Sequence, residues 1–403
     1  MANQRHHDTL MINDTLMINE TTNKKDPYGS VVPPIYQNSL FTFDSWEDIE
    51  TAFEDKINNA IYTRGKNPTV ALAEQKIAML AHGEKAKLFA SGMAAVSAGM
   101  LHFLSAGDHI ITLNNIYGPS ISLINDFLVP KMNVQVSYVS GTELSEIKAA
   151  IQPNTKLIYL ESPSSVVFSL QDLKQISLVA KRYDIATMID NTWATPLFQK
   201  PLELGIDLEI HSCSKYLGGH SDIVSGVLIG SSELLDAIHV IEYELLGAKM
   251  APMEAWFLLR SLRTLDLRME RHQTSGLSIA KFLESHPKVA KVYYPGLESF
   301  PQYKLAKEQM TGSTGLMSFQ LKTQDLKHVK AFFNNLKLFQ IGVSWGGHES
   351  LIYAPAISCL KEQSPEQFEK MGISISDMRI SVGLENVENL IDDLSSSLEL
   401  ITN

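Results

Sequence analysis

The sequence has few cysteines and no extended apolar segment. Only two of its 403 residues are cysteines, Cys213 and Cys359, which is too few for the disulfide framework of a small secreted protein. No apolar run approaches the roughly 20 residues that a membrane-spanning helix needs, and no signal-type core follows a charged N-terminus. These features predict a cytoplasmic protein with no membrane partner. Cys213 is expected to be a small buried side chain rather than a nucleophile.

Positive charge is also scarce. The chain carries 34 Lys and Arg against 45 Asp and Glu, for a net charge of −11, and it lacks a basic block that could neutralise nucleic-acid phosphates. We therefore expect no nucleic-acid partner. The N-terminus contains His6, His7 and an exact duplication of Asp-Thr-Leu-Met-Ile-Asn over 8–19. Two adjacent histidines without further ligands do not predict a metal site, and the duplication has no assigned role.

The pattern of apolar residues predicts an α/β fold. From about residue 70, short apolar runs alternate with helical stretches, as expected for a mostly parallel sheet covered on both faces. After about residue 250, one long helical pattern over 253–285 leads to a smaller α+β set. The expected strands are 87–90, 109–113, 134–139, 156–160, 185–189, 208–211 and 227–229, then 289–294, 316–321, 351–353 and 378–382. Further helices are expected over 94–104, 172–182, 325–334 and 387–401.

Lys215 lies among small hydroxyl residues, and Asp190 ends the apolar run 185–189 upstream of it. This combination suits a pyridoxal phosphate (PLP) site, in which a lysine amine bonds the cofactor and a carboxylate keeps the pyridine nitrogen protonated. The hydroxyls of Ser212 and Ser214 would bind phosphate oxygens. Taken alone, however, these residues fit a solvated loop lysine and a helix-capping aspartate better.

Three further segments carry candidates for binding an anion or a flat ring. Gly92 and Met93 open a helix after a strand, where backbone amides and the helix dipole favour a phosphate. Tyr62 and Arg64 supply a phenol and a guanidinium in an irregular segment. Tyr117 follows a strand and could stack on a planar cofactor. Helix capping, turn formation and the edge of the core are the ordinary alternatives.

Near the C-terminus, Arg379 lies within an apolar strand pattern, downstream of a glycine-rich turn that contains Ser344 and Trp345. A charge in such a strand is costly unless it is paired. Arg379 therefore requires a carboxylate, either from the protein or from a substrate. From this segment alone, an internal ion pair is the expected partner.

Six segments together resemble the Cys/Met-metabolism PLP enzymes, and the resemblance extends from about Pro33 to the C-terminus. This family includes cystathionine γ-synthase, the cystathionine β- and γ-lyases and methionine γ-lyase. In family order, the segments are Tyr-x-Arg-x-x-Asn-Pro-Thr at 62–69, Ser-Gly-Met-Ala-Ala at 91–95, Glu-Ser-Pro at 161–163, Asp-Asn-Thr at 190–192, Ser-x-Ser-Lys-Tyr-x-x-Gly-His-Ser-Asp at 212–222 and Arg-x-Ser-Val-Gly-Leu-Glu at 379–385. Such an ordered set is far more specific than any single motif.

The resemblance implies PLP as the cofactor and a role for each candidate residue. Lys215 would form the Schiff base and take part in catalysis together with Tyr117, which stacks on the ring, while Asp190 would face the pyridine nitrogen. The phosphate would be bound by Gly92, Met93, Ser212 and Ser214 and, from the neighbouring subunit, by Tyr62 and Arg64. The substrate would be bound by Ser344, Trp345 and Arg379.

The resemblance also implies an α/β fold of the aspartate-aminotransferase type (fold type I). Its large domain would have a mostly parallel seven-stranded sheet, and a smaller C-terminal α+β domain would follow. The expected division is 1–62 as an arm that contributes to the neighbouring subunit, 63–255 as the PLP-binding domain and 256–403 as the C-terminal domain. We expect a homo-oligomer, a dimer with shared active sites that pairs into tetramers.

Within the family, several residues resemble the bacterial cystathionine β-lyases more closely than the γ-enzymes. Ser165 stands where the common motif has an Asn that contacts the cofactor's phenolic oxygen, and Trp193 follows the Asp-Asn-Thr motif. Pro119 stands where methionine γ-lyases typically carry a Cys. Val343, in contrast, replaces a Tyr found in some β-lyases of this branch.

The expected reaction is therefore β-elimination from L-cystathionine or a related cysteine S-conjugate, which gives a thiol, pyruvate and ammonia. Elimination or replacement at the γ-carbon on the same scaffold is the nearest alternative. A non-catalytic protein that binds an amino acid is a more distant one. The sequence leaves the preferred thioether open.

Overall fold

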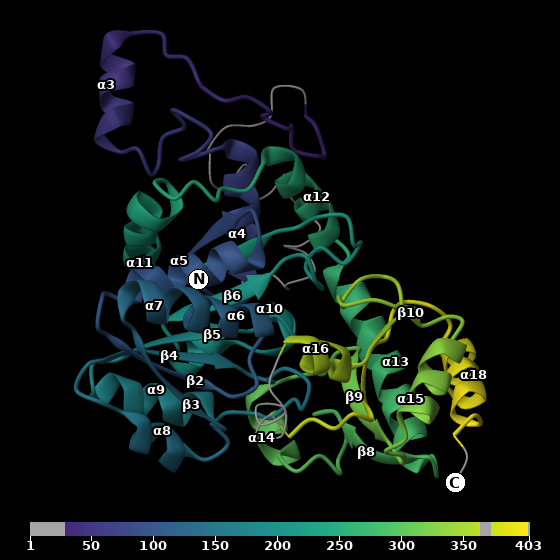
Figure 1. The fold of residues 1–403 in the computed structure, drawn as a ribbon. Coiled ribbons are helices and arrows are strands. Elements are labelled where there is room, and N and C mark those ends of the chain that lie inside the picture. Colours follow the sequence, from purple (N-terminus) through teal and green to yellow (C-terminus); the bar gives the residue numbers. More distant parts are fainter. Residues whose placement is uncertain (1–28, 363–371, 402–403) are drawn as a thin grey trace.

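Two β-sheets, one in each half of the chain, organise the fold (Figure 1). The computed structural model describes residues 29–362 and 372–401, so His6, His7 and the duplicated segment lie outside the described residues. The first sheet has seven strands in the order β1-β7-β6-β5-β4-β2-β3. These strands are β1 (Lys85–Phe89), β2 (His109–Leu113), β3 (Gln135–Val139), β4 (Thr155–Glu161), β5 (Ala186–Asp190), β6 (Leu208–Ser212) and β7 (Gly226–Gly230).

Only β7 runs opposite to its neighbours in this sheet. It pairs antiparallel with β1 and β6, whereas β3, β2, β4, β5 and β6 pair in parallel. The expected mostly parallel seven-stranded sheet is thus confirmed. Because parallel strands share one direction, the carboxyl ends of β2, β4, β5 and β6 lie along one edge, which is where open α/β sheets bind ligands.

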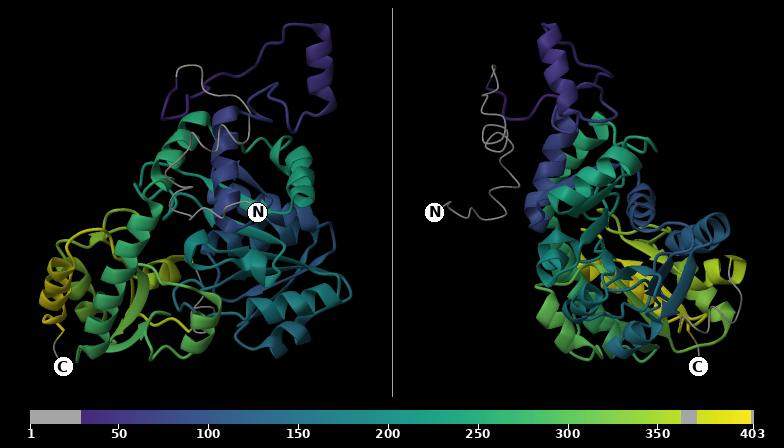
Figure 2. Two further views of the ribbon diagram at one scale, coloured as in Figure 1. Left: turned by 180° about the vertical axis from the view of Figure 1, so that it is seen from behind. Right: turned by 90° about the vertical axis from the view of Figure 1, so that its left-hand side faces the viewer.

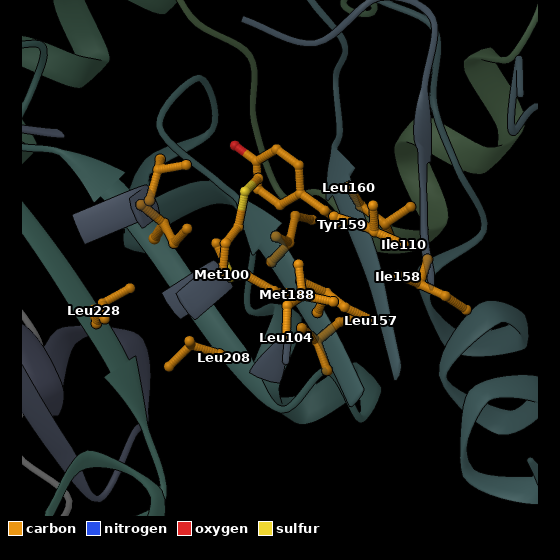
Figure 3. Packing of buried hydrophobic residues seen from close by; sticks show 14 of the residues in the cluster. Met100, Leu104, Ile110, Leu157, Ile158, Tyr159, Leu160, Met188, Leu208 and Leu228 are labelled. Atoms are coloured by element: carbon orange, nitrogen blue, oxygen red, sulfur yellow. The ribbon is translucent and has the colours of Figure 1, made fainter. Parts of the chain in front are cut away.

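Helices cover the first sheet and are packed closely on it. They are α4 (Pro68–Ala81), α5 (Gly92–Phe103), α6 (Gly118–Ser122), η1 (Leu123–Leu128), α7 (Val129–Met132), α8 (Leu144–Ala150), α9 (Leu173–Arg182), α10 (Thr195–Phe198), η2 (Pro201–Leu204), α11 (Ser232–Ile238), η3 (His239–Tyr243) and α12 (Pro252–Leu262). Figure 3 shows Met100 of α5 in one buried cluster with Met188 of β5 and Tyr159 of β4. Gly99 permits this approach, because a Cβ there would lie 2.7 Å from Met188 Sδ. The packing therefore holds α5 against the sheet, with its N-terminus just after β1.

The second sheet has five strands in the order β10-β11-β12-β9-β8, antiparallel except for the β10–β11 pair. Its strands are β8 (Val289–Tyr293), β9 (Leu316–Leu321), β10 (Gln340–Ile341), β11 (Leu351–Tyr353) and β12 (Asp377–Ser381). Its helices are α13 (Leu265–Ser285), α14 (Tyr303–Gln309), α15 (Leu326–Asn335), α16 (Pro355–Glu362) and α18 (Val387–Leu398). This agrees with the expected smaller α+β set. Trp193, near the end of β5, is buried in the second core and donates through Nε1 to Leu316 O at 3.1 Å.

The single long helix expected over 253–285 is wrong, because the chain forms α12 and α13 with a break at Thr264. The Thr264 side chain donates to the Ser261 carbonyl at 3.3 Å, and Arg268 donates to the same carbonyl at 2.9 Å. Arg268 also donates to Tyr216 O at 2.6 Å, so its guanidinium joins the break to the segment after β6. These side chains satisfy backbone groups that an unbroken helix would have paired internally.

The described residues before α4 include α3 (Trp46–Glu54), which lies away from both sheets (Figure 2). Within residues 29–362 and 372–401, none of the helices combines the length and apolar character needed to cross a bilayer. The first sheet ends at residue 230 and the second begins at residue 289. The division at residues 62 and 255 stays a prediction.

Candidate active site

Lys215 lies three residues after β6 and reaches toward the C-terminal sheet's loops. Its Nζ donates to Ser344 Oγ at 2.8 Å and lies 5.3 Å from the centroid of the Trp345 ring. Burial and, to a smaller extent, the Arg379 charge lower the pKa of Lys215 to about 8, against an opposing effect of the Asp190 charge. A solvated loop lysine would show neither these contacts nor this shift. Lys215 is instead an amine with a raised neutral fraction near pH 7.

Asp190 and Glu161 form a pair of buried carboxyls at the ends of β5 and β4, directly opposite each other in the strand register. Asp190 Oδ1 accepts from Thr192 N at 3.0 Å and from Thr192 Oγ1 at 2.5 Å. Burial raises the pKa of both carboxyls, and the Asp190 charge raises the pKa of Glu161 further. Asp190 caps no helix, because α10 begins only at Thr195.

Glu161 is a site residue that the motif analysis did not single out. Its Oε2 accepts from Tyr117 N at 2.7 Å and its Oε1 accepts from the Ser165 hydroxyl at 2.6 Å. Ser165 therefore contacts Glu161 rather than projecting freely toward a ligand. The available signal was positional, since Glu161 ends the strand next to the one that ends at Asp190.

The start of α5 forms a cradle for an anion beside Ser212. The Ser91 hydroxyl accepts from Ala94 N at 3.0 Å, which leaves the earlier amides of Gly92 and Met93 at the open end of the helix. A Cβ on Gly92 would lie 3.0 Å from Ser212 Oγ, so glycine lets this backbone approach the hydroxyl without crowding it. Ser214 lies farther along, and its hydroxyl donates to Ser225 O at 3.3 Å and accepts from Ser225 N at 3.0 Å.

Tyr117 stands at the strand edge just before α6 and is 46% exposed. Burial of its phenol raises the pKa of Tyr117, with Asp190 adding to this effect and Arg379 opposing it. The charges of Asp190 and Arg379 therefore both affect the ionisation of the Tyr117 phenol. The ring is thus partly open to solvent, as a ring that stacks on a cofactor would have to be before the cofactor binds.

Arg379 faces the same site from β12, and the internal ion pair expected for it is wrong. Among the described residues its guanidinium contacts carbonyls, at 2.5 Å to Val343 O and 3.5 Å to Ser344 O, and no carboxylate pairs with it. Burial lowers the pKa of Arg379 to about 10, at which it remains cationic near neutral pH. A half-buried cation without an internal anion suits a carboxylate supplied by a ligand. Trp345, the neighbour of Ser344, packs edge-on against the Tyr216 ring at 5.5 Å.

The structure does not bring Tyr62 and Arg64 into this group of residues. Tyr62 is 48% exposed, and Arg64 pairs at 3.6 Å with Glu244 of its own chain. Their expected place in a neighbouring subunit's site is therefore not tested by a single chain. Within the part of the chain that the structure describes, no group of three or more His, Cys, Asp or Glu side chains could hold a metal ion.

The residues at this edge fit PLP in each of its functional parts. The tight Gly92–Ser212 contact and the free helix amides offer donors for a phosphate, and Lys215 offers an amine of lowered pKa. Asp190 offers a buried carboxylate for a protonated ring nitrogen, and Tyr117 offers an aromatic face. These residues lie at or after the carboxyl ends of β2, β5 and β6 and at the start of α5.

Comparisons with known proteins agree with this fit. The profile of the family described as "Cys/Met metabolism PLP-dependent enzyme" matches residues 14–399. An L-methionine gamma-lyase of Fusobacterium nucleatum is 42% identical over 94% of this chain and 95% of its own length. A cystathionine beta-lyase of Lactococcus lactis subsp. cremoris is 40% identical over 92% of this chain and 94% of its own.

The crystal structure of a cystathionine gamma synthase from Xanthomonas oryzae pv. oryzae, in complex with aminoacrylate and cysteine, has a TM-score of 0.91 and 33% identity over 99% of both chains. The identities to the β- and γ-lyases are too similar to separate these branches. The fold type and the cofactor expected from the motifs are both confirmed. The chain belongs to the Cys/Met metabolism family of PLP-dependent enzymes, and pyridoxal phosphate is its cofactor.

Proposed function

We propose that this enzyme is a carbon–sulfur lyase that catalyses β-elimination from L-cystathionine or a related cysteine S-conjugate, giving homocysteine or another thiol, pyruvate and ammonia. The observation that carries the proposal is that the low-pKa amine of Lys215 and the buried Asp190 carboxyl face the Arg379 cation, which pairs with no carboxylate among the described residues. Pro119, at the start of α6, favours the β-branch over a dedicated methionine γ-lyase.

Each of the site residues would have a separate role in this reaction. The bound cofactor supplies a conjugated ring that accepts the electron pair left on the substrate Cα. Lys215 would hold the cofactor at rest and, once released by the substrate amine, take the proton from Cα as a neutral base. Its pKa of about 8 makes this possible near neutral pH. Arg379 and Ser344 would orient the substrate by its α-carboxylate.

Tyr117 would complete the elimination as an acid. Burial raises the pKa of its phenol, so the group stays protonated at neutral pH and can donate to the departing thiolate. The same ring would stack on the cofactor. Asp190 would hold a proton on the cofactor's ring nitrogen, and the Thr192 hydrogen bonds fix its carboxylate for that purpose.

The second candidate is γ-elimination from methionine, which is favoured by the 42% identical methionine gamma-lyase relative. Purified enzyme with PLP should be offered cystathionine, cystine, methionine and O-acetylhomoserine, and the keto acid and thiol products identified. Pyruvate from cystathionine as the fastest product supports our proposal. A fastest reaction that yields 2-oxobutyrate would replace it with γ-elimination.

Replacing Arg379 with lysine should impair substrate binding much more than turnover. Lysine keeps the charge but cannot present two parallel N–H donors to a carboxylate. We expect Arg379→Lys to raise KM about 10- to 100-fold, the value of one charge-assisted hydrogen bond. Steady-state kinetics measures this, and an unchanged KM would remove Arg379 from the substrate site.

We also propose that the enzyme acts as a homo-oligomer whose sites are shared between subunits, with dimers that pair into tetramers. Apolar side chains are exposed on two segments, namely Trp46, Ile49 and Phe53 on α3 and Val240, Ile241, Leu245 and Leu246 on and after η3. Such surfaces are typical of subunit contacts.

We propose that the enzyme is cytoplasmic. The free, buried Cys213 thiol suits the reducing conditions of the cytoplasm.

Sharing of the site between subunits predicts complementation. The double variant Tyr62→Phe/Arg64→Ala keeps Lys215 but loses the side chains proposed to reach the neighbour's phosphate, whereas Lys215→Ala keeps those side chains. After subunit exchange, hybrid dimers should contain one intact site, and random mixing should restore about a quarter of wild-type activity. Exchange is verified with differently tagged subunits. Proven hybrids without recovered activity would show that each subunit's site is complete.

A further inference from the structure

Tyr353 lies directly opposite Arg379 in the antiparallel β11–β12 pair. The Arg379 Cζ is 5.0 Å from the centroid of the Tyr353 ring, within the range of a cation–π contact. Directly paired residues project from the same face of a sheet, so the strand register itself brings the ring to the guanidinium. Tyr353 was not among the residues expected at the site.

The hydrogen bonds of Arg379 hold only one part of its guanidinium. Nη2 donates to Val343 O at 2.5 Å and to Ser344 O at 3.5 Å, and no carboxylate pairs with the group in the described part of the chain. A planar group held through a single nitrogen can still tilt. A ring against its face limits that tilt and consumes none of the N–H donors. A carboxylate at position 353, by contrast, would compete with a substrate for those donors.

The Tyr353 ring is fixed in turn from its other end. Its hydroxyl forms a hydrogen bond with Ser358 Oγ on α16, the helix that follows β11. The ring is thus held by its own strand and by α16 while it contacts the guanidinium.

We propose that Tyr353 is a positioning residue that sets the plane of the Arg379 guanidinium, so that its free N–H donors face the substrate α-carboxylate. This inference rests on the proposed function, in which Arg379 binds that carboxylate. The contact is to the face of the ring, so phenylalanine should largely replace tyrosine and an aliphatic side chain should not.

We therefore expect Tyr353→Leu to raise KM for the amino-acid substrate about 5- to 30-fold, while kcat changes by less than about threefold. Tyr353→Phe should stay within about threefold of wild type in both constants, because it keeps the ring and loses only the contact with Ser358. Thermal melting of both holoenzymes shows whether each variant is folded. A Tyr353→Leu enzyme with wild-type KM, or a Tyr353→Phe enzyme as impaired as Tyr353→Leu, would overturn the inference.

A binding measurement separates positioning from a general structural effect. L-Alanine and ethylamine differ only by the carboxylate, and neither carries a leaving group. Both are titrated into each PLP-loaded enzyme while the visible absorbance of the cofactor is followed. We expect the Kd of alanine to rise about 5- to 30-fold in Tyr353→Leu and the Kd of ethylamine to stay unchanged.

Equal weakening of both ligands would show that Tyr353 supports the site only structurally and would overturn the inference. An unchanged Kd for alanine would do the same. A wild-type enzyme that responds to ethylamine but not to alanine would instead overturn the proposed amino-acid chemistry, and the inference would fail with it. The response of the wild type thus distinguishes failure of the function from failure of the positioning role.

Discussion

Replacing Lys215 with alanine is expected to remove both the covalent attachment of the cofactor and nearly all turnover. The variant loses the amine that holds PLP and the base that takes the Cα proton, and loss of a positioned base alone costs about 10²- to 10⁴-fold in rate. Borohydride reduction of the wild-type holoenzyme, followed by peptide mapping, should place the trapped cofactor on Lys215. Reduction of Lys215→Ala should trap no cofactor on the chain.

Lys200 provides a matched control for this experiment. Burial lowers its pKa to about 8, as in Lys215, but its Nζ donates to the Leu80 carbonyl and the charges that act on it are those of Glu203 and Glu209 rather than Asp190 and Arg379. Lys200→Met should therefore keep the cofactor attached and keep its turnover. Trapped cofactor on Lys200, or normal pyruvate release by Lys215→Ala, would show that a low pKa was mistaken for a catalytic role.

The predicted site residues that the fold brings near one another stand at strand ends or helix starts. Asp190 ends an apolar run and Gly92 starts a helix, and these local patterns survive in the fold because the parallel sheet places the carboxyl ends of its strands on one edge. The motif order added specificity that no single residue had. The roles of these side chains toward the cofactor remain proposals.

What the sequence could not provide depends on contacts between distant segments. Within the described residues Arg379 contacts backbone carbonyls and the Tyr353 ring rather than a carboxylate, and the contact with the ring follows from the register of β11 with β12. The break before α13 was hidden because helix-favouring residues surround Thr264, and its stabilisation comes from Arg268 and from the segment after β6. The place of the Glu161 carboxyl in the site likewise depends on contacts with other segments, because it accepts from Tyr117 N and lies opposite Asp190.

Asp190→Asn is expected to have the second large effect, on kcat rather than on KM. The amide keeps the shape of the side chain and can still accept from Thr192, but it cannot hold a proton on the cofactor's ring nitrogen. Losing the anionic partner of a buried cation should lower kcat about 10²- to 10³-fold. Steady-state kinetics at saturating substrate and PLP measures the change.

Glu161→Gln is the control that separates a specific role of Asp190 from a general effect of losing a buried carboxylate. Both carboxyls are buried, face each other across β4 and β5 and have raised pKa values, so a nonspecific loss of negative charge would affect activity equally in the two variants. Glutamine at 161 keeps one oxygen that can accept from Tyr117 N, and its amide NH2 can donate to the Ser165 hydroxyl, so we expect kcat to fall less than about tenfold. If Glu161→Gln were instead the more damaging change, the carboxylate that serves the cofactor ring would lie on β4, and the roles of Asp190 and Glu161 would have to be exchanged.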